Sequence, residues 1–344
     1  MKELYVNGIY LTDKVSGGVR RAATEIVRAL KEIEGVRLIV LCPPEASVPT
    51  EEDGVEYRRI GRCKSNLWEQ ISLARYLKKN PGICLNLCNA YPVRAKNNFV
   101  IFHDVRPIEE KLEGKKSLFI AKFHFLLKRA KKKNLPILTV SQFSKRRICE
   151  LYGYDPDRIS VIRLGHEHLQ NHIAEEKKSA DDWGEYYLSV SSIMPHKNFA
   201  LVMQLARLHP NKAFYIIGQR YDDSINELPE NVKYLGRLSD GELAAYYRHA
   251  TAFIAPSLYE GFGLTPLEAI YFGCKRVYCS DIDVFHEIYG GLCSYFDPHV
   301  PESFDFGMSH TITETERNVL LENFTWRHCA EDILNAINAL AEKK

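Results

Sequence analysis

Long apolar runs are missing from this sequence. No stretch of the 344 residues approaches the roughly 18 consecutive apolar residues that a membrane-spanning helix requires. The first residues, MKELYVNGIYL, also lack the apolar region and the small-residue cleavage site of a secretory signal peptide. We therefore expect a cytoplasmic protein without a membrane span.

Paired cysteines and metal-binding clusters are missing as well. The nine cysteines are scattered without a C-x-x-C pair, and neither Cys84 with Cys88 nor Cys274 with Cys279 completes a zinc set. No group of carboxylates has the spacing of metal ligands. Helix-turn-helix, zinc and RNP patterns are also lacking, which argues against nucleic acid as a partner. The sequence therefore predicts reduced thiols, no metal and no bound cofactor.

Charge is plentiful but unevenly distributed. The 45% hydrophobic and 26% charged content is that of a globular protein, and the length suits two domains. Residues 1–165 contain 31 lysines and arginines against 18 acidic residues, whereas residues 166–344 contain 15 against 26. The net charge of +2 thus combines a basic half with an acidic half, which favours a different partner for each half.

Strand and helix patterns alternate along the chain. Amphipathic helix patterns such as VRRAATEIVRALKEI lie between apolar strand patterns such as VRLIVLC, ICLNLC and LPILTVS. The polar residues 170–182 interrupt this alternation, and EYYLSVSS begins a second series. Repeated βα units predict parallel, doubly wound sheets that bind ligands at the carboxyl ends of their strands. We place a domain boundary between residues 170 and 171.

The most informative stretch is SLYEGFGLTPLEAIYFGCKRV, residues 257–277, which follows the apolar strand pattern ATAFIAPS. Gly261 and Gly263 let backbone N–H groups approach a ligand, and the helix start that follows attracts anions. We expect Thr265 to cap this helix and Glu268 to complete a capping box. Glu260 precedes the helix, where a carboxylate has no capping role and is suited to the hydroxyl groups of a ligand.

Three shorter motifs lie at the predicted carboxyl ends of other strands. Gly17 and Gly18 follow the first strand, His103 and Asp104 follow VIF, and Lys197 lies in PHKN at a strand-to-helix turn. A lysine in such a turn is suited to neutralising a diphosphate. A glycine pair or a lone histidine is more often structural, so each of these motifs is weak evidence by itself.

Taken together, these motifs resemble those of the retaining glycosyltransferases of family 4, which have the two-domain GT-B fold. The resemblance rests on an E-x7-E signature, a G-G-x-x-R loop, VIFHD and P-x-K-N; the signature residues are Glu260, Gly261, Phe262, Gly263, Leu264, Pro266, Glu268, Ala269 and Gly273. It implies two Rossmann-like, doubly wound parallel-sheet domains that face a central cleft. Residues 1–170 would bind the acceptor, residues 171–322 the nucleotide sugar, and the helix at 323–344 would cross back to the first domain.

The resemblance also implies a reaction and its residues. A hexose would pass from a nucleotide sugar, GDP- or UDP-linked, to a glycan or lipid-linked glycan, with retention of anomeric configuration and without metal, as in cell-surface polysaccharide synthesis. Glu260 and His103 would contact the transferred sugar, and Lys197 would neutralise the leaving phosphate. The other donor-binding positions would be Gly17, Gly18, Arg21, Gly236, Arg237, Phe262, Gly263, Leu264 and, on the ribose, Glu268.

One departure from the family pattern concerns the cations of the donor site. Many relatives carry an arginine a few residues before the lysine, where this chain has Ser191-Ser192-Ile193. We expect Arg21 to compensate, with Arg20 and Arg237 as weaker alternatives.

A basic segment runs from Lys111 to Lys133, with nine lysines and arginines against one acidic residue, interleaved with leucine and phenylalanine. A basic amphipathic helix favours an anionic membrane surface, although an ordinary surface helix packed on a sheet is the alternative. We expect peripheral binding to the inner face of the membrane through Lys128, Arg129, Lys131, Lys132 and Lys133.

Other functions fit the same residues less well. Two carboxylates also suit a glycoside hydrolase, but the phosphate-binding features would then have no use. A sugar-nucleotide epimerase would keep the fold yet need no basic face. A membrane-docked scaffold with a relic site would explain the missing arginine, but not the presence of Glu260, Lys197 and Glu268 together.

Overall fold

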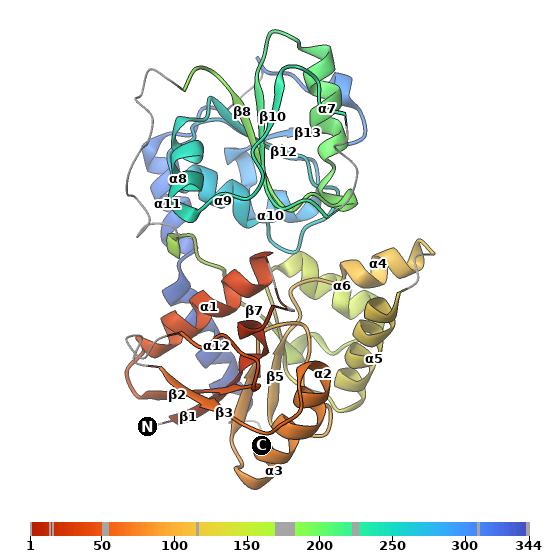
Figure 1. Cartoon of the computed structure of the whole chain (residues 1–344), viewed down its shortest axis with the longest axis vertical. Coiled ribbons are helices and arrows are strands. Elements are labelled where there is room, and N and C mark those ends of the chain that lie inside the picture. The colour runs from red at the N-terminus through yellow and green to blue at the C-terminus, as the bar shows by residue number, and fades with distance from the viewer. Residues whose placement is uncertain are drawn as a thin grey trace. The chain divides into compact units, whose positions relative to one another are not determined.

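The computed structural model describes residues 2–13, 15, 17–49, 55–114, 117–168, 183–221, 227–307 and 310–341. They form two compact units, one from residues 1–165 with 326–344 and one from residues 166–325 (Figure 1). The predicted boundary between residues 170 and 171 lies outside the described residues. Each unit is described by itself below.

The first unit is built on a seven-stranded sheet in the order β3-β2-β1-β4-β5-β6-β7. All of its strand pairs are parallel. The central strands are apolar and buried on both faces, as expected for a sheet covered by helices. The strands are β1 (Lys2–Asn7), β2 (Val36–Cys42), β3 (Glu56–Arg59), β4 (Ile83–Asn86), β5 (Asn98–Ile101), β6 (Ile137–Thr139) and β7 (Ile159–Val161).

Helix α1 (Gly17–Lys31) follows β1 and the short η1 (Gly8–Leu11), and it packs against α12 (Trp326–Ala341). It buries an apolar stripe of Ala22, Ala23, Ile26, Val27 and Leu30. Arg163, just after β7, donates from Nε and Nη2 to the two carboxylate oxygens of Asp332 on α12, at 2.8 and 2.7 Å. Such a bidentate pair fixes geometry as well as adding energy, so α12 belongs structurally to the first unit.

The helical segment at residues 65–79 is not regular throughout. The chain forms α2 (Ser65–Leu67), a π-helical turn η3 (Trp68–Leu73) and α3 (Ala74–Lys79). The wider turn places the Glu69 side chain inside the unit, where its carboxylate accepts a hydrogen bond from Asn7 Nδ2 at 2.8 Å. A π-turn in a helix is uncommon and is often found at functional sites.

The basic segment at 111–133 is not one helix. Helix α4 (Arg106–Leu112) ends before Gly114, whose φ of 90° breaks the helical path, and α5 (Leu118–Lys132) starts from a new cap. That cap is Ser117, whose hydroxyl accepts a hydrogen bond from the amide of Ile120 at 3.1 Å. Helix α6 (Gln142–Tyr152) and η4 (Pro156–Arg158) complete the first unit's described helices.

The second unit contains a six-stranded parallel sheet in the order β10-β9-β8-β11-β12-β13. The strands are β8 (Tyr187–Val190), β9 (Phe214–Ile217), β10 (Val232–Tyr234), β11 (Ala252–Ala255), β12 (Val277–Ser280) and β13 (Ser294–Phe296). The helices are η7 (Pro195–Lys197), α7 (Phe199–Leu208), α8 (Asp240–His249), α9 (Leu264–Tyr271), α10 (Asp283–Tyr289), η8 (Gly290–Leu292), η9 (Pro301–Ser303) and α11 (Glu314–Asn323). The predicted fold class, two doubly wound parallel-sheet units, is confirmed.

In each sheet the order of strands reverses direction once. The first reversal lies between β1 and β4, and the second lies between β8 and β11. At such a switch point the two following loops leave toward opposite faces of the sheet, so a crevice forms above the carboxyl ends of the strands. Ligand-binding residues are therefore expected in the loops after these four strands.

Gly218 is indispensable to the packing of the second sheet. Its φ is +149°, and a Cβ atom there would lie 1.7 Å from the carbonyl oxygen of Ser191. We expect Gly218→Ala to destabilise the second unit by about 3 kcal/mol or more, from strain plus overpacking. Thermal unfolding measures the loss. Gly291→Ala is the matched control, because no atom lies within 4 Å of its added Cβ; equal stability of the two variants would contradict the prediction.

Candidate functional site

Two oppositely charged side chains meet at the switch point of the second unit. Lys197 follows β8 and Glu260 follows β11, and Lys197 Nζ lies 2.5 Å from Glu260 Oε1. The hydroxyl of Ser257 donates to the same oxygen at 2.8 Å. Both charged side chains are about 15% exposed, at 16% and 14%. The structure therefore brings together the lysine and the carboxylate that the sequence predicts to act on the donor.

Backbone contacts explain why two loops 63 residues apart meet here. The amide of Leu258 donates to the carbonyl of His196 at 2.8 Å, which joins the loop after β11 to η7. Asn198 ends η7 in the left-handed conformation, with φ of 53°, and its side chain donates to the carbonyl of Pro298 at 2.9 Å. The P-x-K-N sequence thus forms a fixed turn that holds Lys197 against Glu260.

Gly263 sets the start of helix α9. Its φ is +91°, and a Cβ atom there would lie 2.5 Å from the Phe285 ring. The buried Tyr289 donates its hydroxyl hydrogen to the Gly263 carbonyl. The helix consequently begins at Leu264, and the prediction that Thr265 is its cap is wrong. The first-turn amides of Leu264 and its neighbours form the helix amino terminus that was expected to attract a phosphate.

Glu268 does not complete a capping box. It is only 5% exposed, and its carboxylate accepts hydrogen bonds from two buried partners. His168 Nε2 lies 2.8 Å from Oε1, and the Tyr247 hydroxyl lies 2.6 Å from Oε2. Neither partner could be found from sequence spacing, because His168 is 100 residues away and Tyr247 is 21 residues away. This environment does not suit an acid or nucleophile of a hydrolase, which must be exposed to its substrate.

Three more of the predicted donor residues, Phe262, Gly236 and Arg237, lie in the same unit. Phe262 is 3% exposed and packs edge-on against Phe324, so its side chain is part of the core and only its backbone lines the loop. Gly236 follows β10 with φ of 69°, and its carbonyl accepts from the Gly218 amide at 2.8 Å. Arg237 beside it is exposed.

One cation at this edge was missed by the sequence reasoning. Arg220 pairs in a parallel bridge with Ile193, inside the segment where the expected arginine is absent. The Ile193 amide donates to the Gln219 carbonyl at 2.8 Å, and the Tyr221 amide donates to the Ile193 carbonyl at 3.1 Å. Arg220 is exposed. Only strand pairing, which sequence spacing does not show, places it beside this loop.

The other predicted residues lie in the first unit. His103 is 7% exposed, and its Nε2 donates to the Leu87 carbonyl at 2.9 Å. Burial lowers the pKa of His103, so the ring is neutral and its Nδ1 is an acceptor. Gly17 and Gly18 are the first residues of α1 and not of a preceding loop, and Arg21 lies one turn later. A Cβ on Gly18 would have no atom within 4 Å, so packing does not require glycine there.

A buried carboxyl group lies at the switch point of the first unit. Glu69 accepts from Asn7 at the end of β1, and Asn7 also donates to Asn86 Oδ1 at the end of β4, at 3.1 Å. Burial raises the pKa of Glu69. Its neighbour Gln70 donates to the Tyr91 carbonyl and accepts from the Val93 amide, which holds the loop after β4. This network ties together the two loops that flank the switch point.

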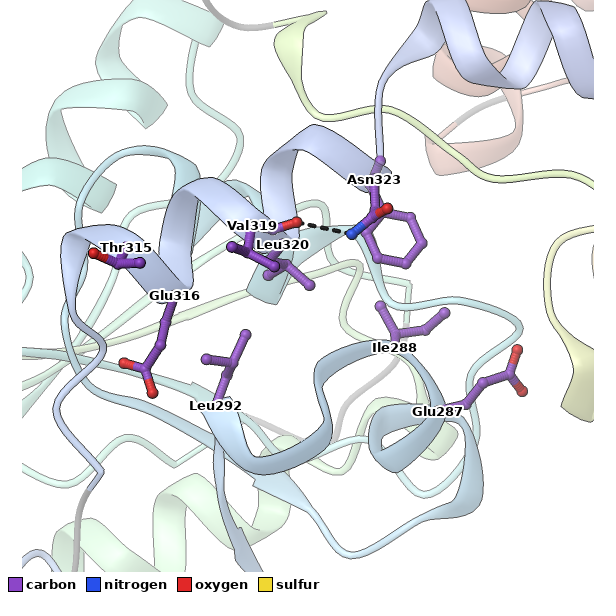
Figure 2. A pocket seen from close by; sticks show the side chains of 9 residues that line it. Glu287, Ile288, Leu292, Thr315, Glu316, Val319, Leu320 and Asn323 are labelled. Carbon is purple, nitrogen blue, oxygen red and sulfur yellow. Dashed lines mark hydrogen bonds between the residues drawn. The ribbon is translucent and has the colours of Figure 1, made fainter.

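The second unit also has a mainly apolar cavity of about 450 Å³ between α10, η8 and α11. Figure 2 shows Ile288 and Leu292 below Val319 and Leu320 in this view. None of the predicted site residues lines it, although Phe324 at one end contacts Phe262. The cavity is therefore separate from the candidate site.

The surface of α5 combines exposed apolar side chains with cations. Leu118, Phe119 and Phe125 are 88%, 58% and 53% exposed, whereas the opposite face of the helix is buried in the unit. Lys122 Nζ donates to Asn66 on α2 at 2.8 Å, next to Leu67, which is 65% exposed. Of the predicted surface cations, Lys128, Lys131 and Lys132 are exposed, Arg129 is half-buried, and the Lys133 ammonium donates to the Val93 carbonyl.

Two further observations concern metal and membrane. Among the described residues, no three His, Cys, Asp or Glu side chains are grouped so that they could hold a metal ion, and all nine cysteines are free. No helix in the described ranges is both long and apolar enough to span a bilayer.

Comparison with known proteins identifies related families and structures. Residues 16–168 match the family described as Glycosyltransferase Family 4, and residues 171–290 match Glycosyl transferases group 1. The chain is 29% identical to the O-antigen chain mannosyltransferase RfbU of Salmonella typhimurium over 72% of this chain and 70% of that protein. It is 29% identical to O-antigen chain mannosyltransferase B of Escherichia coli over 59% of this chain and 60% of that protein.

Solved structures share the fold. The glycosyltransferase WaaG, involved in lipopolysaccharide biosynthesis, superposes with a TM-score of 0.66 at 15% identity over 99% of both chains. Anabaena HepE in complex with UDP and glucose superposes with a TM-score of 0.72 at 16% identity, over 98% of this chain and 99% of that one.

Acid should destabilise the first unit through His103. Because burial lowers its folded pKa below the ordinary value of about 6.5, the unfolded chain takes up the proton first, and stability falls as the pH drops below that value. We expect His103→Gln, which retains a side-chain donor for the Leu87 carbonyl, to lose less stability between pH 7.5 and 5.5. Urea unfolding at both pH values measures this.

Because only about one pH unit of this range lies below the unfolded pKa, the difference should amount to at most about 1.4 kcal/mol. Burial also lowers the pKa values of His124 and His166, so part of the acid sensitivity should persist in the variant. The same pH dependence in wild type and variant would contradict the neutral, buried state of His103.

Proposed function

Since this chain belongs to the GT-B glycosyltransferases and its first part matches family 4, we propose that it transfers a hexose from a nucleotide sugar to a glycan acceptor. The observation that carries this proposal is the Lys197–Glu260 pair at the switch point. The amino terminus of α9, which begins after Gly263, follows Glu260 in the same loop and is suited to binding an anion. A cation, a helix amino terminus and a hydroxyl-binding carboxylate match the phosphates and the sugar of such a donor.

The residues have distinct roles in the proposed reaction. Lys197 neutralises the charge that develops on the leaving phosphate, and the first amides of α9 bind its oxygens. Glu260 accepts hydrogen bonds from the sugar hydroxyl groups once the phosphate has drawn Lys197 away. His103 shapes the sugar site as a neutral acceptor and is not the catalytic base. The leaving phosphate accepts the proton of the acceptor hydroxyl, so the acceptor oxygen attacks the sugar from the same face that the phosphate leaves. The new glycosidic bond therefore replaces the bond to phosphate with retention of configuration.

The names of the relatives support a choice of substrate class. Two of them are O-antigen chain mannosyltransferases, and the Anabaena structure contains UDP and glucose. We infer a GDP- or UDP-hexose as donor, with mannose as the first sugar to test. The acceptor is a glycan or lipid-linked glycan of a cell-surface polysaccharide.

Arg220 is a better candidate than Arg21 for the second cation of the donor site. It lies in the second unit and pairs directly with Ile193, in the segment where the family pattern leads us to expect an arginine. Arg21 instead lies on α1 of the first unit. Two cations on one diphosphate share its charge, so removing either should weaken the binding of the donor.

The donor site can be tested by calorimetry of GDP, UDP, ADP and dTDP with and without EDTA. We expect tight binding of one nucleotide, unchanged by EDTA, because Lys197 and the helix terminus supply the positive charge. Lys197→Ala should weaken this binding and reduce transfer by about 10²–10³, the usual effect of losing one charge-stabilising donor. Arg220→Ala should weaken binding more than Arg21→Ala.

Lys275→Ala is the control, because Lys275 is an exposed lysine of the same unit that lies between α9 and β12. It should leave binding and transfer unchanged. Full activity of Lys197→Ala would refute the site assignment. The absence of binding by any of the four nucleotides would favour the relic-site scaffold.

We further propose that the acceptor is reached at an anionic membrane surface through α5. Leu118, Phe119 and Phe125 project from the helix, and the exposed Lys128 and Lys132 and the half-buried Lys122 lie on the same helix. Apolar and cationic side chains together are typical of a helix that lies in a membrane interface. Leu67 on α2 extends the apolar part through the Asn66–Lys122 contact. The exposed cations add about 1 kcal/mol each near anionic lipid.

Sedimentation with vesicles of phosphatidylglycerol and phosphatidylcholine tests this surface. We expect the double variant Phe119→Ser, Phe125→Ser to bind at least tenfold more weakly, because burying each ring contributes about 1.5–3 kcal/mol. The control is Leu208→Ser, Val319→Ser, which removes two apolar side chains of similar exposure, 49% and 57%, from the second unit. Equal binding by both double variants would remove α5 from the proposal.

A further inference from the structure

The buried carboxylate of Glu268 is held by two donors from different parts of the second unit. His168 lies after the first unit's last strand, Tyr247 lies on α8, and Glu268 lies on α9. The His168 side chain is fully buried, with 0% exposed, and the Glu268 side chain is 6% exposed. A carboxylate only accepts hydrogen bonds, so His168 Nε2 and the Tyr247 hydroxyl both donate to it. The two contacts fix both of its oxygens.

We propose that His168 and Tyr247 are positioning residues for the nucleotide: they orient the Glu268 carboxylate so that it accepts the hydroxyl groups of the donor's ribose. This inference rests on the proposed nucleotide-sugar transfer. It adds two residues that touch no substrate and act only through Glu268. It also predicts how the site distinguishes a ribonucleotide from a 2′-deoxyribonucleotide.

The position of Glu268 on α9 favours a role at the ligand. It lies one turn beyond Leu264, on the helix whose amino terminus is the proposed phosphate site. Burying a carboxylate is costly, and a residue with a purely structural task here could be apolar like its neighbours Leu267, Ala269 and Ile270. The free-energy cost of burying this carboxylate is explained if Glu268 binds hydroxyl groups of the donor close to its diphosphate.

Attachment of the chain does not require His168. Two residues earlier, His166 already holds this segment to the unit: its Nδ1 lies 2.7 Å from the Phe324 carbonyl oxygen, and its ring lies 4.7 Å from that of Tyr271. Arg317 donates to the Tyr271 carbonyl at 2.7 Å and supports the same place. The His168–Glu268 contact is therefore available for a different purpose, the orientation of the carboxylate.

The Tyr247 hydroxyl is held rigidly in place. Its ring is fully buried, stacks on Phe272 with centroids 5.9 Å apart, and packs against Phe253 at 5.7 Å. Because the ring is fixed on two sides, the position of its hydroxyl oxygen is fixed as well, within hydrogen-bond distance of Glu268 Oε2. The geometry of the carboxylate is thus determined by the packed core of the unit.

This arrangement fits the vicinal hydroxyl groups of a ribose. A carboxylate has about four lone-pair sites, and the bonds from His168 and Tyr247 fall on different oxygens, so each oxygen is held by a donor of its own. Two adjacent hydroxyls can then donate to the two oxygens side by side. A 2′-deoxyribose lacks one of these donors, so the discrimination between the two sugars reports on the orientation of Glu268.

The test compares GDP and UDP with their 2′-deoxy counterparts by calorimetry on the full chain. Wild type should bind the ribonucleotide at least about tenfold more tightly, the size of one hydrogen bond to a charged group. Tyr247→Phe retains the ring and removes only the hydroxyl, so it should reduce this ratio at least about threefold, because the deoxynucleotide makes only one of the two hydrogen bonds to Glu268 and therefore loses less affinity than the ribonucleotide. His168→Leu should do the same, and His168→Gln, which restores a donor, should recover most of the ratio.

Tyr186→Phe is the matched control. Tyr186 is equally buried, and its hydroxyl donates to the Tyr246 carbonyl at 2.7 Å, away from Glu268. It should leave the ratio unchanged. If Tyr247→Phe weakens the binding of the ribonucleotide and of the deoxynucleotide by the same factor, or changes neither affinity, the positioning role is refuted while the proposed function stands. If wild type binds no nucleotide, the proposed function fails and this inference fails with it.

Discussion

The reversal of strand order is the constraint on which the functional part of the second unit depends. Strands β8 and β11 are neighbours, but the chain leaves them toward different faces, so their loops cannot cover the edge between them. Lys197 follows one strand and Glu260 follows the other, and this is why they meet although 63 residues separate them. Glycines adjust the same edge: Gly218 lets the end of β9 pass against the Ser191 carbonyl, and Gly263 turns the chain into α9 over Phe285.

The fold class and the local motifs were predictable because their signals are local. Apolar runs such as VRLIVLC identify buried strands, and PHKN and EGFGLTPLE show their loop-to-helix character within a few residues. The details that failed depend on neighbours in space. Thr265 is not the cap of α9, because Phe285 and Tyr289 fix the turn at Gly263. The partners of Glu268 could not be predicted, because no periodicity relates His168, Tyr247 and Glu268.

The basic segment shows a different limit of sequence reasoning. Its charge and its apolar residues predict a single amphipathic helix, but Gly114 ends α4, and a new cap at Ser117 begins α5. The number of cations in a segment also does not predict the direction of each side chain. Lys133 is one of the predicted membrane-binding cations, yet its ammonium donates to the backbone carbonyl of Val93. What the sequence could not show at all is the exposure of Leu118, Phe119 and Phe125, which distinguishes an interfacial helix from an ordinary surface helix.

Glu260 and Glu268 have different surroundings, and this difference argues for different roles. Glu260 has a cationic partner and partial access to solvent, so an arriving phosphate can compete for Lys197 and release the carboxylate to the sugar. Glu268 is bound by a histidine and a tyrosine inside the core, where no movement of charge is needed to bind a hydroxyl group. A group that must change partners during transfer has to be accessible, whereas a group that only selects its ligand is best held rigid. In the proposed reaction, Glu260 is therefore suited to the reacting sugar and Glu268 to the nucleotide, which does not change during the transfer.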